Sequence, residues 1–192
     1  MIELTRGQEM VLAREDGRPL GRLRMGLGWD KKPGAGFIGS GAADFDLDAS
    51  AFQYAGPQLF DLAFFNHLET RDGSVVHLGD NISGRGEGDD EVITIDLEKV
   101  WPTVDTILFL VSSYQGQTLE WVHSAYCRLV EDDGTEDGTE LARFTLTQGV
   151  PRTGFMMAKM FRDGDQWRLR AIGQGIPVTV PTDSLDVLQR FV

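Results

Sequence analysis

The sequence predicts an all-β fold, an antiparallel β-sandwich of about ten short strands with little helix. Short runs rich in β-branched and aromatic residues recur along the chain, and turn-forming residues separate them. The separators at residues 71–74 and 163–165 each contain an Asp-Gly pair, which tolerates the positive φ angles of a tight hairpin turn. Many short strands with turn signals between them are typical of a sandwich.

The individual elements follow from local patterns. Residues 44–50 alternate between acidic and apolar side chains, and residues 107–111 are continuously apolar, as expected of a central strand. In chain order, we expect strands at residues 9–13, 44–50, 59–66, 75–78, 92–97, 106–112, 119–130, 141–147, 154–161 and 166–172. We also expect one helical turn at residues 97–101, ended by Pro102, and a capped helix start at residues 182–186.

Composition indicates a single domain that spans residues 1–192. The hydrophobic content of 41% argues against intrinsic disorder, and the length allows a core of sufficient size. Thirty acidic residues against eighteen basic ones give a net charge of −12. This charge opposes binding to nucleic acid and unaided docking on anionic lipid, because like charges repel.

Three features favour a cytoplasmic protein. The single cysteine, Cys127, excludes an intrachain disulfide, and its position in an apolar strand predicts a core residue rather than a nucleophile. The N-terminal residues lack the long apolar run of a signal peptide. No window approaches the ~18 apolar residues of a membrane span, so we expect no transmembrane segment.

The most informative segment is a glycine-rich acidic loop at residues 79–91, Gly-Asp-Asn-Ile-Ser-Gly-Arg-Gly-Glu-Gly-Asp-Asp-Glu. Crowded carboxylates repel one another unless a cation neutralises them, and alternating glycines let the chain turn its carbonyls inward. Such an oxygen-rich set suits a hard divalent cation, Ca²⁺ above all, whereas the alternative is a solvated acidic hairpin loop. The candidate ligands in this loop are Asp80, Asn81, Gly84, Gly86, Asp89, Asp90 and Glu91.

The loop differs from the common metal motifs. If Asp80 is counted as the first position, an EF-hand requires Gly where Arg85 stands. The glycine-rich nonapeptide of calcium-binding β-helices needs tandem copies, and the chain has one. The loop contains no Cys or His, which disfavours zinc. Magnesium stays an alternative, although the number of acids favours the larger ion.

A second acidic element is the predicted strand at residues 44–50. In an extended chain Asp44, Asp46 and Asp48 point to one face. Three carboxylates on one face need a cation, an Arg neighbour or open water; the alternative is an edge strand whose charges prevent aggregation. A phosphatase-like Asp-x-Asp site is disfavoured, because small residues at 39–43 precede it instead of a buried apolar strand. Asp30, which follows a glycine-flanked turn, is a further candidate ligand.

Four segments carry a resemblance to a known family. They are Gly-Leu-Gly-Trp-Asp at residues 26–30, Asp-Leu-Asp-Ala-Ser-Ala-Phe at residues 46–52, the acidic loop, and the closing segment at residues 167–175. In this order, over most of the chain, they resemble the TerD family of tellurium-resistance and stress-response proteins. Two positions differ from the family pattern: Ser83 stands where Thr is usual, and Lys159 replaces an acid, which affects any partner contact through its strand.

The resemblance implies a calcium-binding β-sandwich of the bacterial cytoplasm with no settled enzymatic activity. It implies association with stress-related, membrane-linked protein complexes, and we expect two calcium ions. The residues that it implies as contributors to the calcium sites are Asp46, Asp48, Asp80, Asn81, Asp89, Asp90 and Glu91.

We therefore expect a calcium-binding, non-enzymatic stress-response protein that acts as a scaffold or interaction module for protein partners. The alternative is a metal-dependent hydrolase that uses the clustered Asp residues. A third class, calcium-dependent adhesion or glycan binding, is disfavoured by the lack of a signal peptide. Few features favour catalysis: the chain has no G-x-S-x-G, Walker or H-E-x-x-H motif, and His67, His77 and His123 are isolated.

Overall fold

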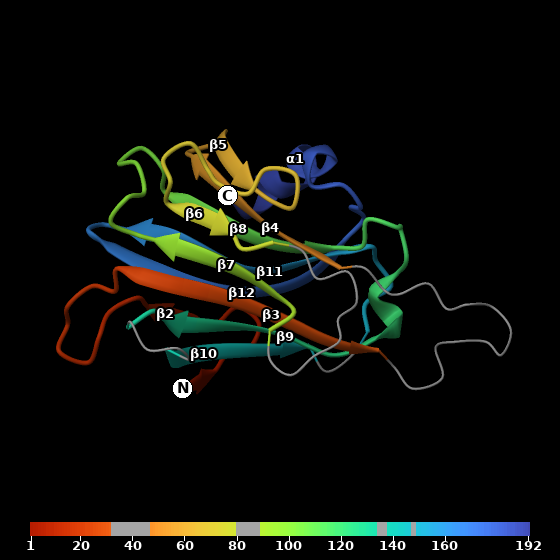
Figure 1. Cartoon of the computed structure of the whole chain (residues 1–192), viewed down its shortest axis with the longest axis horizontal. Helices are drawn as coiled ribbons and strands as arrows, with labels where there is room; N and C mark the ends of the chain where they lie inside the picture. Colours follow the sequence, from red (N-terminus) through yellow and green to blue (C-terminus); the bar gives the residue numbers. More distant parts are fainter. Residues whose placement is uncertain (32–46, 80–88, 134–137, 147–148) are drawn as a thin grey trace, which may run out of the picture.

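Two six-stranded sheets form the protein in a computed structural model that describes residues 1–31, 47–79, 89–133, 138–146 and 149–192 (Figure 1). The first sheet contains, in spatial order, β1 (Ile2–Glu3), β10 (Thr139–Leu146), β9 (Val122–Glu131), β3 (Arg22–Lys31), β7 (Glu91–Asp96) and β6 (Val75–His77). The second contains β2 (Glu9–Val11), β12 (Gln166–Ile176), β11 (Gly154–Asp163), β8 (Thr106–Ser112), β4 (Asp48–Ala55) and β5 (Gln58–Ala63). Only β1 and β10 pair in parallel among these strands, so the predicted antiparallel β-sandwich is confirmed.

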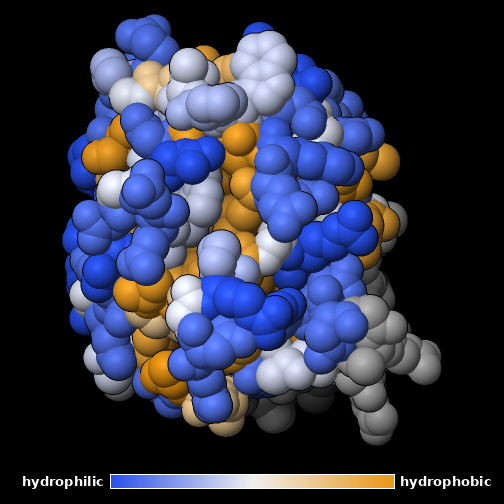
Figure 2. All heavy atoms as spheres, turned by 90° about the vertical axis from the view of Figure 1, so that its left-hand side faces the viewer, coloured by the Kyte–Doolittle hydropathy of each residue, from blue (hydrophilic) through white to orange (hydrophobic). Residues whose placement is uncertain are grey.

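The main hydrophobic core lies between the two sheets. Strand β7 shows how the sequence builds it: Glu91, Ile93 and Ile95 are buried, whereas the residues between them are half-buried, as the period of two requires. Figure 2 shows the end of the molecule that carries the β11–β12 turn, where hydrophobic residues form a band through the middle and hydrophilic residues flank it. The apolar faces of both sheets therefore turn toward each other.

A second apolar cluster covers the outer face of the second sheet. The C-terminal segment consists of the 3₁₀ turns η2 (Pro181–Ser184) and η3 (Gln189–Phe191) around the short helix α1 (Leu185–Leu188). Leu188 and Phe191 from this segment cluster with apolar residues of β4, β8 and β11. A helix thus begins within the predicted residues 182–186, but no side chain caps it, because the hydroxyl of Ser184 donates to the carbonyl of Pro181 instead. No helix in the described part of the chain has the length and apolar character needed to cross a bilayer.

Strand β8 coincides with the predicted strand at residues 106–112, and every residue in it is buried because both faces of its sheet are covered. The two Asp-Gly turns are also confirmed, with φ of +66° at Gly73 and +62° at Gly164. Residues 97–99, by contrast, form a turn and not the predicted helical turn, with the N–H of Lys99 donating to the carbonyl of Asp96.

Strand β3 is absent from the predicted strands, although it lies in the middle of the first sheet. Its inward residues Leu23, Met25, Leu27 and Trp29 are all buried. The outward positions alternate with them, but two of these positions are glycines, which look like a turn in the sequence. Close neighbours, described below, explain why glycine stands there.

Strand β4 corrects the edge-strand alternative for the second acidic element. It begins at Asp48 and lies between β5 and β8, so it is an interior strand. Residues 48–54 are buried on both faces, and Asp48 itself is only 3% exposed. Asp44 and Asp46 lie outside the described residues.

Candidate metal site

Three strand ends meet at one end of the sandwich, on the right-hand side of Figure 1. They are the C-terminal end of β3 and the N-terminal ends of β4 and β7. Asp48 is the first residue of β4, and Glu91 is the first residue of β7, preceded by Asp90 and Asp89. Four of the sequence-predicted ligands therefore lie at or just before strand ends of the two sheets, at the same end of the sandwich.

Glu91 connects the two sheets. Its Oε2 accepts a hydrogen bond from the backbone N–H of Ala49 on β4, and it lies 3.5 Å from Nε2 of His77 on β6. The side chains of Glu91 and His77 are both 0% exposed. The N–H of Gly79 donates to Nδ1 of His77 at 3.1 Å, so a neutral ring carries its proton on Nε2, the nitrogen that faces Glu91.

Asp90 attaches the start of β7 to the end of β3. Its Oδ2 accepts a hydrogen bond from the backbone N–H of Trp29 at 2.9 Å, and its own N–H donates to the carbonyl of Leu27 at 2.7 Å. Trp29 is buried in the core. These two bonds hold the backbone before β7 against the adjacent strand.

Asp89 lies on the outer side of the first sheet in a network of side chains. Its Oδ1 accepts hydrogen bonds from Nε of Arg128 at 2.7 Å and from the hydroxyl of Tyr126 at 3.1 Å. The bond to Asp89 raises the pKa of Arg128, while burial and then the Asp89 carboxylate raise the pKa of Tyr126 to about 12. Arg128 also contacts Glu140 at 3.3 Å. Asp89 is therefore held by a cation of the protein itself.

The glycines of β3 make room for this network. A Cβ at Gly26 would overlap the carboxylate of Asp89, and a Cβ at Gly28 would lie 2.5 Å from the ring of Tyr126. Because real side chains do not approach so closely, any larger residue would displace Asp89 or Tyr126. The Gly-Leu-Gly-Trp-Asp motif thus combines two buried apolar residues with two glycines that the outer network requires.

Three residues in contact with the site were not among the predicted ligands: His77, Tyr126 and Arg128. His77 is a strand-face histidine, as expected, but it faces Glu91 and is not isolated. Arg128 is 39 residues from Asp89 in the sequence, and no local motif joins the two. The sequence signal for Arg128 is a charged residue within the otherwise apolar stretch at residues 125–130.

The other candidate ligands lie beyond the described part of the chain. Asp30 belongs to β3, but its side chain is not described. Asp44, Asp46, Asp80, Asn81, Gly84 and Gly86 are outside the described residues. Among the described residues alone, no three His, Cys, Asp or Glu side chains form a group that could hold a metal ion.

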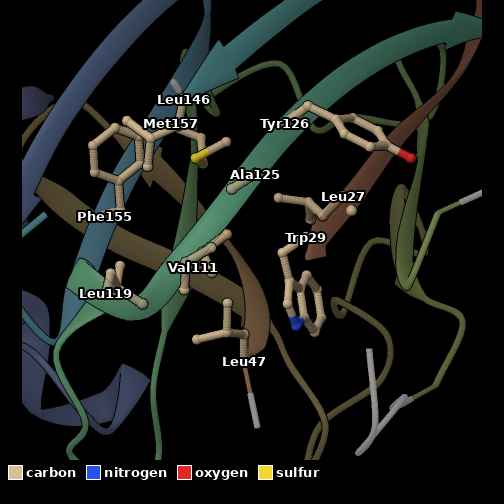
Figure 3. A pocket seen from close by; sticks show the side chains of 12 residues that line it. Leu27, Trp29, Leu47, Val111, Leu119, Ala125, Tyr126, Leu146, Phe155 and Met157 are labelled. Carbon is tan, nitrogen blue, oxygen red and sulfur yellow. The ribbon is translucent and has the colours of Figure 1, made fainter. Parts of the chain in front are cut away.

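An apolar cavity of about 20 Å³ lies next to the site, between the sheets (Figure 3). Leu27, Trp29 and Leu47 line one side of it, and Val111 and Phe155 come from the second sheet. It is the size of a single water molecule and offers few polar groups, so it does not resemble a substrate pocket.

Cys127 is a core residue, as the sequence predicts. It is buried between the sheets, and burial raises the pKa of its thiol to about 12. A thiol with such a pKa stays protonated at neutral pH and is a weak nucleophile.

Comparisons with known proteins identify the family. Residues 1–181 match the TerD domain. The chain is 36% identical to the tellurium resistance protein TerZ of Serratia marcescens (90% of this chain, 89% of that protein) and 34% identical to the stress response protein SCP2 of Bacillus subtilis (100% and 99%). A crystal structure of a TerD homologue from Streptomyces coelicolor has the same fold, with a TM-score of 0.67 and 21% identity over 86% of this chain and 95% of that one. This chain therefore belongs to the TerD family.

Proposed function

We propose that this protein is a calcium-binding, non-enzymatic protein of the stress response or of tellurite resistance, in which calcium controls contact with a protein partner. The names of its relatives, which include tellurium resistance and stress response proteins, support the physiological part of the proposal. The arrangement of acids at the end of the sandwich supports the calcium part.

The observation that carries the proposal is the position of Glu91. Its hydrogen bond to Ala49 holds the start of β7 beside the start of β4, and Asp48 is the residue next to Ala49. Two nearly fully buried carboxylates, Asp48 and Glu91, thus belong to neighbouring strand ends. A divalent cation would offset the cost of burying negative charge, and oxygen ligands on fixed strand ends suit Ca²⁺.

The remaining candidate ligands are adjacent to these strand ends in the sequence. Residues 44–46 directly precede Leu47 and Asp48, and residues 80–88 directly precede Asp89. Asp89 would have a positioning role, because Arg128 and Tyr126 already occupy its Oδ1. Asp48, Asp90 and Glu91 would be the ligands that the sandwich itself supplies, and the acidic segments would complete one or two calcium sites.

Calorimetric titration of calcium into metal-stripped protein tests this proposal. We expect saturable binding of up to two ions, weakened about tenfold or more by Asp90→Asn, because charge count sets the affinity of calcium sites. The matched control is Asp132→Asn, an exposed acid that changes net charge equally. Equal loss in both variants would mean that bulk negative charge, and not a defined site, attracts the ion.

The partner part needs a separate experiment. Pull-downs from native extract should recover a partner with calcium that is lost with chelator and with Asp90→Asn, because ion binding changes the charge and order of the acidic end. The same partners under all three conditions would contradict calcium control. Metal-dependent hydrolysis of a phosphate ester, lost in Asp90→Asn, would instead favour the hydrolase alternative.

A further inference from the structure

A groove of about 440 Å³ lies on the outer side of the second sheet, beside the C-terminal segment and away from the main hydrophobic core. Its floor comes from Lys159 on β11 and from Arg170 and Ile172 on β12. Arg6, in the connection between β1 and β2, and Arg190, in the C-terminal segment, also line it. The volume lies in the range of small-molecule sites, about 300–1,000 Å³.

The groove is basic in a protein of net charge −12. Four of the residues that line it, Arg6, Lys159, Arg170 and Arg190, are cationic, and no Asp or Glu is among the described lining residues. These cations come from four separate segments of the chain. Anions are attracted to this basic groove, whereas the rest of the acidic surface repels them.

Two of the cations lie close together at the floor. Lys159 and Arg170 are direct partners in the register of β11 and β12, and like charges in this position repel. Burial, and then the charge of Arg170, lower the pKa of Lys159. Both cations lie over the ring of Phe161, at 5.4 and 5.2 Å from its centre. An anion between them would replace this repulsion with attraction.

Other contacts hold both cations in place before any ligand arrives. Nζ of Lys159 donates to the carbonyl of Phe191 at 2.8 Å. Glu9 on the neighbouring strand β2 pairs with Arg170, and its other oxygen lies 3.2 Å from Nε of Arg168. Arg168 also lies 3.2 Å from the carboxylate of Asp163, so the excess positive charge of the groove comes from Arg6, Lys159 and Arg190. Because the side chains of Lys159 and Arg170 are already held in place, less side-chain entropy is lost on ligand binding than at a site with mobile side chains.

We propose that this groove binds a small organic phosphate. A phosphate monoester carries about two negative charges at neutral pH and three acceptor oxygens, which matches several Arg and Lys donors better than a single carboxylate does. The apolar side chains of Ile172 and Phe191 would contact the organic part of the ligand.

Titration calorimetry with glycerol 3-phosphate tests the proposal, at constant ionic strength and with chelator present. The chelator keeps this test separate from the calcium proposal, so either can fail alone. We expect saturable one-to-one binding. Lys159→Gln should weaken it about tenfold, because one charge-assisted bond is lost. Lys99→Gln, at a side chain 58% exposed outside the groove, should leave the affinity within about twofold.

Arg190→Gln is the second variant, because Arg190 is exposed and its replacement does not disturb the sheet. It should also weaken binding, with an unchanged melting temperature. No saturable binding to the unmodified protein, or equal weakening by Lys99→Gln, would overturn the proposal.

Two further ligands test whether the groove prefers a phosphate to a carboxylate, and whether that phosphate is soluble or belongs to a lipid. Acetate at the same concentration should bind at least tenfold more weakly than glycerol 3-phosphate, because it carries half the charge. Equal binding of acetate would overturn the phosphate assignment. Vesicles of phosphatidylcholine with phosphatidic acid should not bind the protein; binding to these vesicles without binding to soluble glycerol 3-phosphate would assign the groove to a lipid headgroup and overturn the proposal.

Discussion

The carboxylate of Glu91 accepts a hydrogen bond from the backbone N–H of Ala49, and this bond joins the first residue of β7 in one sheet to β4 in the other. The same oxygen lies 3.5 Å from Nε2 of His77, and the side chains of both residues are completely buried. One carboxylate therefore ties together three strands at the end of the sandwich where the acidic residues gather.

Glu91→Gln should destabilise the protein by about 1–3 kcal/mol, because it replaces a charge-assisted hydrogen bond in a buried place by a neutral one. Urea unfolding with chelator present measures the change without any contribution from calcium. Glu98→Gln, at an exposed position, is the matched control and should have little effect. Equal stability of the two variants would show that the contact between Glu91 and Ala49 contributes little.

Gly26→Ala should lower the free energy of unfolding by about 1–3 kcal/mol, because the new methyl group overlaps the carboxylate of Asp89. Gly21→Ala is the control, since its Cβ would meet only the end of the Glu98 side chain at 3.2 Å. Thermal or urea unfolding measures the free energy of unfolding of both variants. A Gly26→Ala protein as stable as Gly21→Ala would mean that Asp89 does not occupy this position.

Calcium should raise the melting temperature of the unmodified protein. A ligand that binds only the folded state at about a hundred times its dissociation constant adds ~2.7 kcal/mol to the free energy of unfolding. Scanning calorimetry in chelator and in millimolar calcium provides the comparison, and magnesium at the same concentration tests the choice of ion. An identical midpoint in chelator and calcium is the result that would count against the proposed site.

Asp72 should make stability depend on pH in the acidic range. Burial opposes its ionisation, but hydrogen bonds from Ser74, Thr70 and the N–H of Trp101 outweigh this effect and lower its pKa below the ordinary 3.8. Because the pKa is lower in the folded state, this contribution is present at neutral pH and disappears as the pH falls below about 4.

The corresponding variant is Asp72→Asn. It should cost about 1 kcal/mol at pH 7 and less near pH 3, because the unfolded chain is then mostly protonated at this position and part of the contribution of the carboxylate is lost. Asp165→Asn, an exposed acid in another turn, should show no such pH-dependent difference. A cost for Asp72→Asn that is the same at both pH values would refute the assignment.

The thiol of Cys127 should react slowly with a thiol reagent in the folded protein and rapidly in urea. Burial raises its pKa to about 12, so the thiolate that such reagents require is scarce at neutral pH, and the side chain is also inaccessible. A reagent that releases a coloured group on reaction with a thiol allows the rate to be measured by absorbance. Fast labelling without denaturant would show that this part of the core opens readily.

Local sequence patterns are sufficient to predict much of the fold. The apolar run that forms β8 and the Asp-Gly turns at Gly73 and Gly164 depend on neighbouring residues alone, because alternation and turn geometry are properties of a few consecutive dihedral angles. The acidic and glycine-rich motifs, in their order along the chain, likewise indicate the TerD family, which the match over residues 1–181 confirms.

The incorrect predictions have a different origin. Strand β3 is not predicted because Gly26 and Gly28 resemble turn residues, whereas in the folded protein they let Asp89 and Tyr126 approach the sheet. The edge-strand alternative for Asp48 is wrong because the neighbours of a strand are not encoded in its own residues.

The sequence by itself determined that this protein is a β-sandwich with its acids concentrated in a few segments, since strand periodicity and composition are local. Only the tertiary structure decided which acid meets which partner. Asp89 pairs with Arg128 across 39 residues, and Glu91 binds Ala49 across 42. Such contacts depend on distances of about 3 Å, which sheet register and the packing of one sheet on the other set, and no local pattern encodes them.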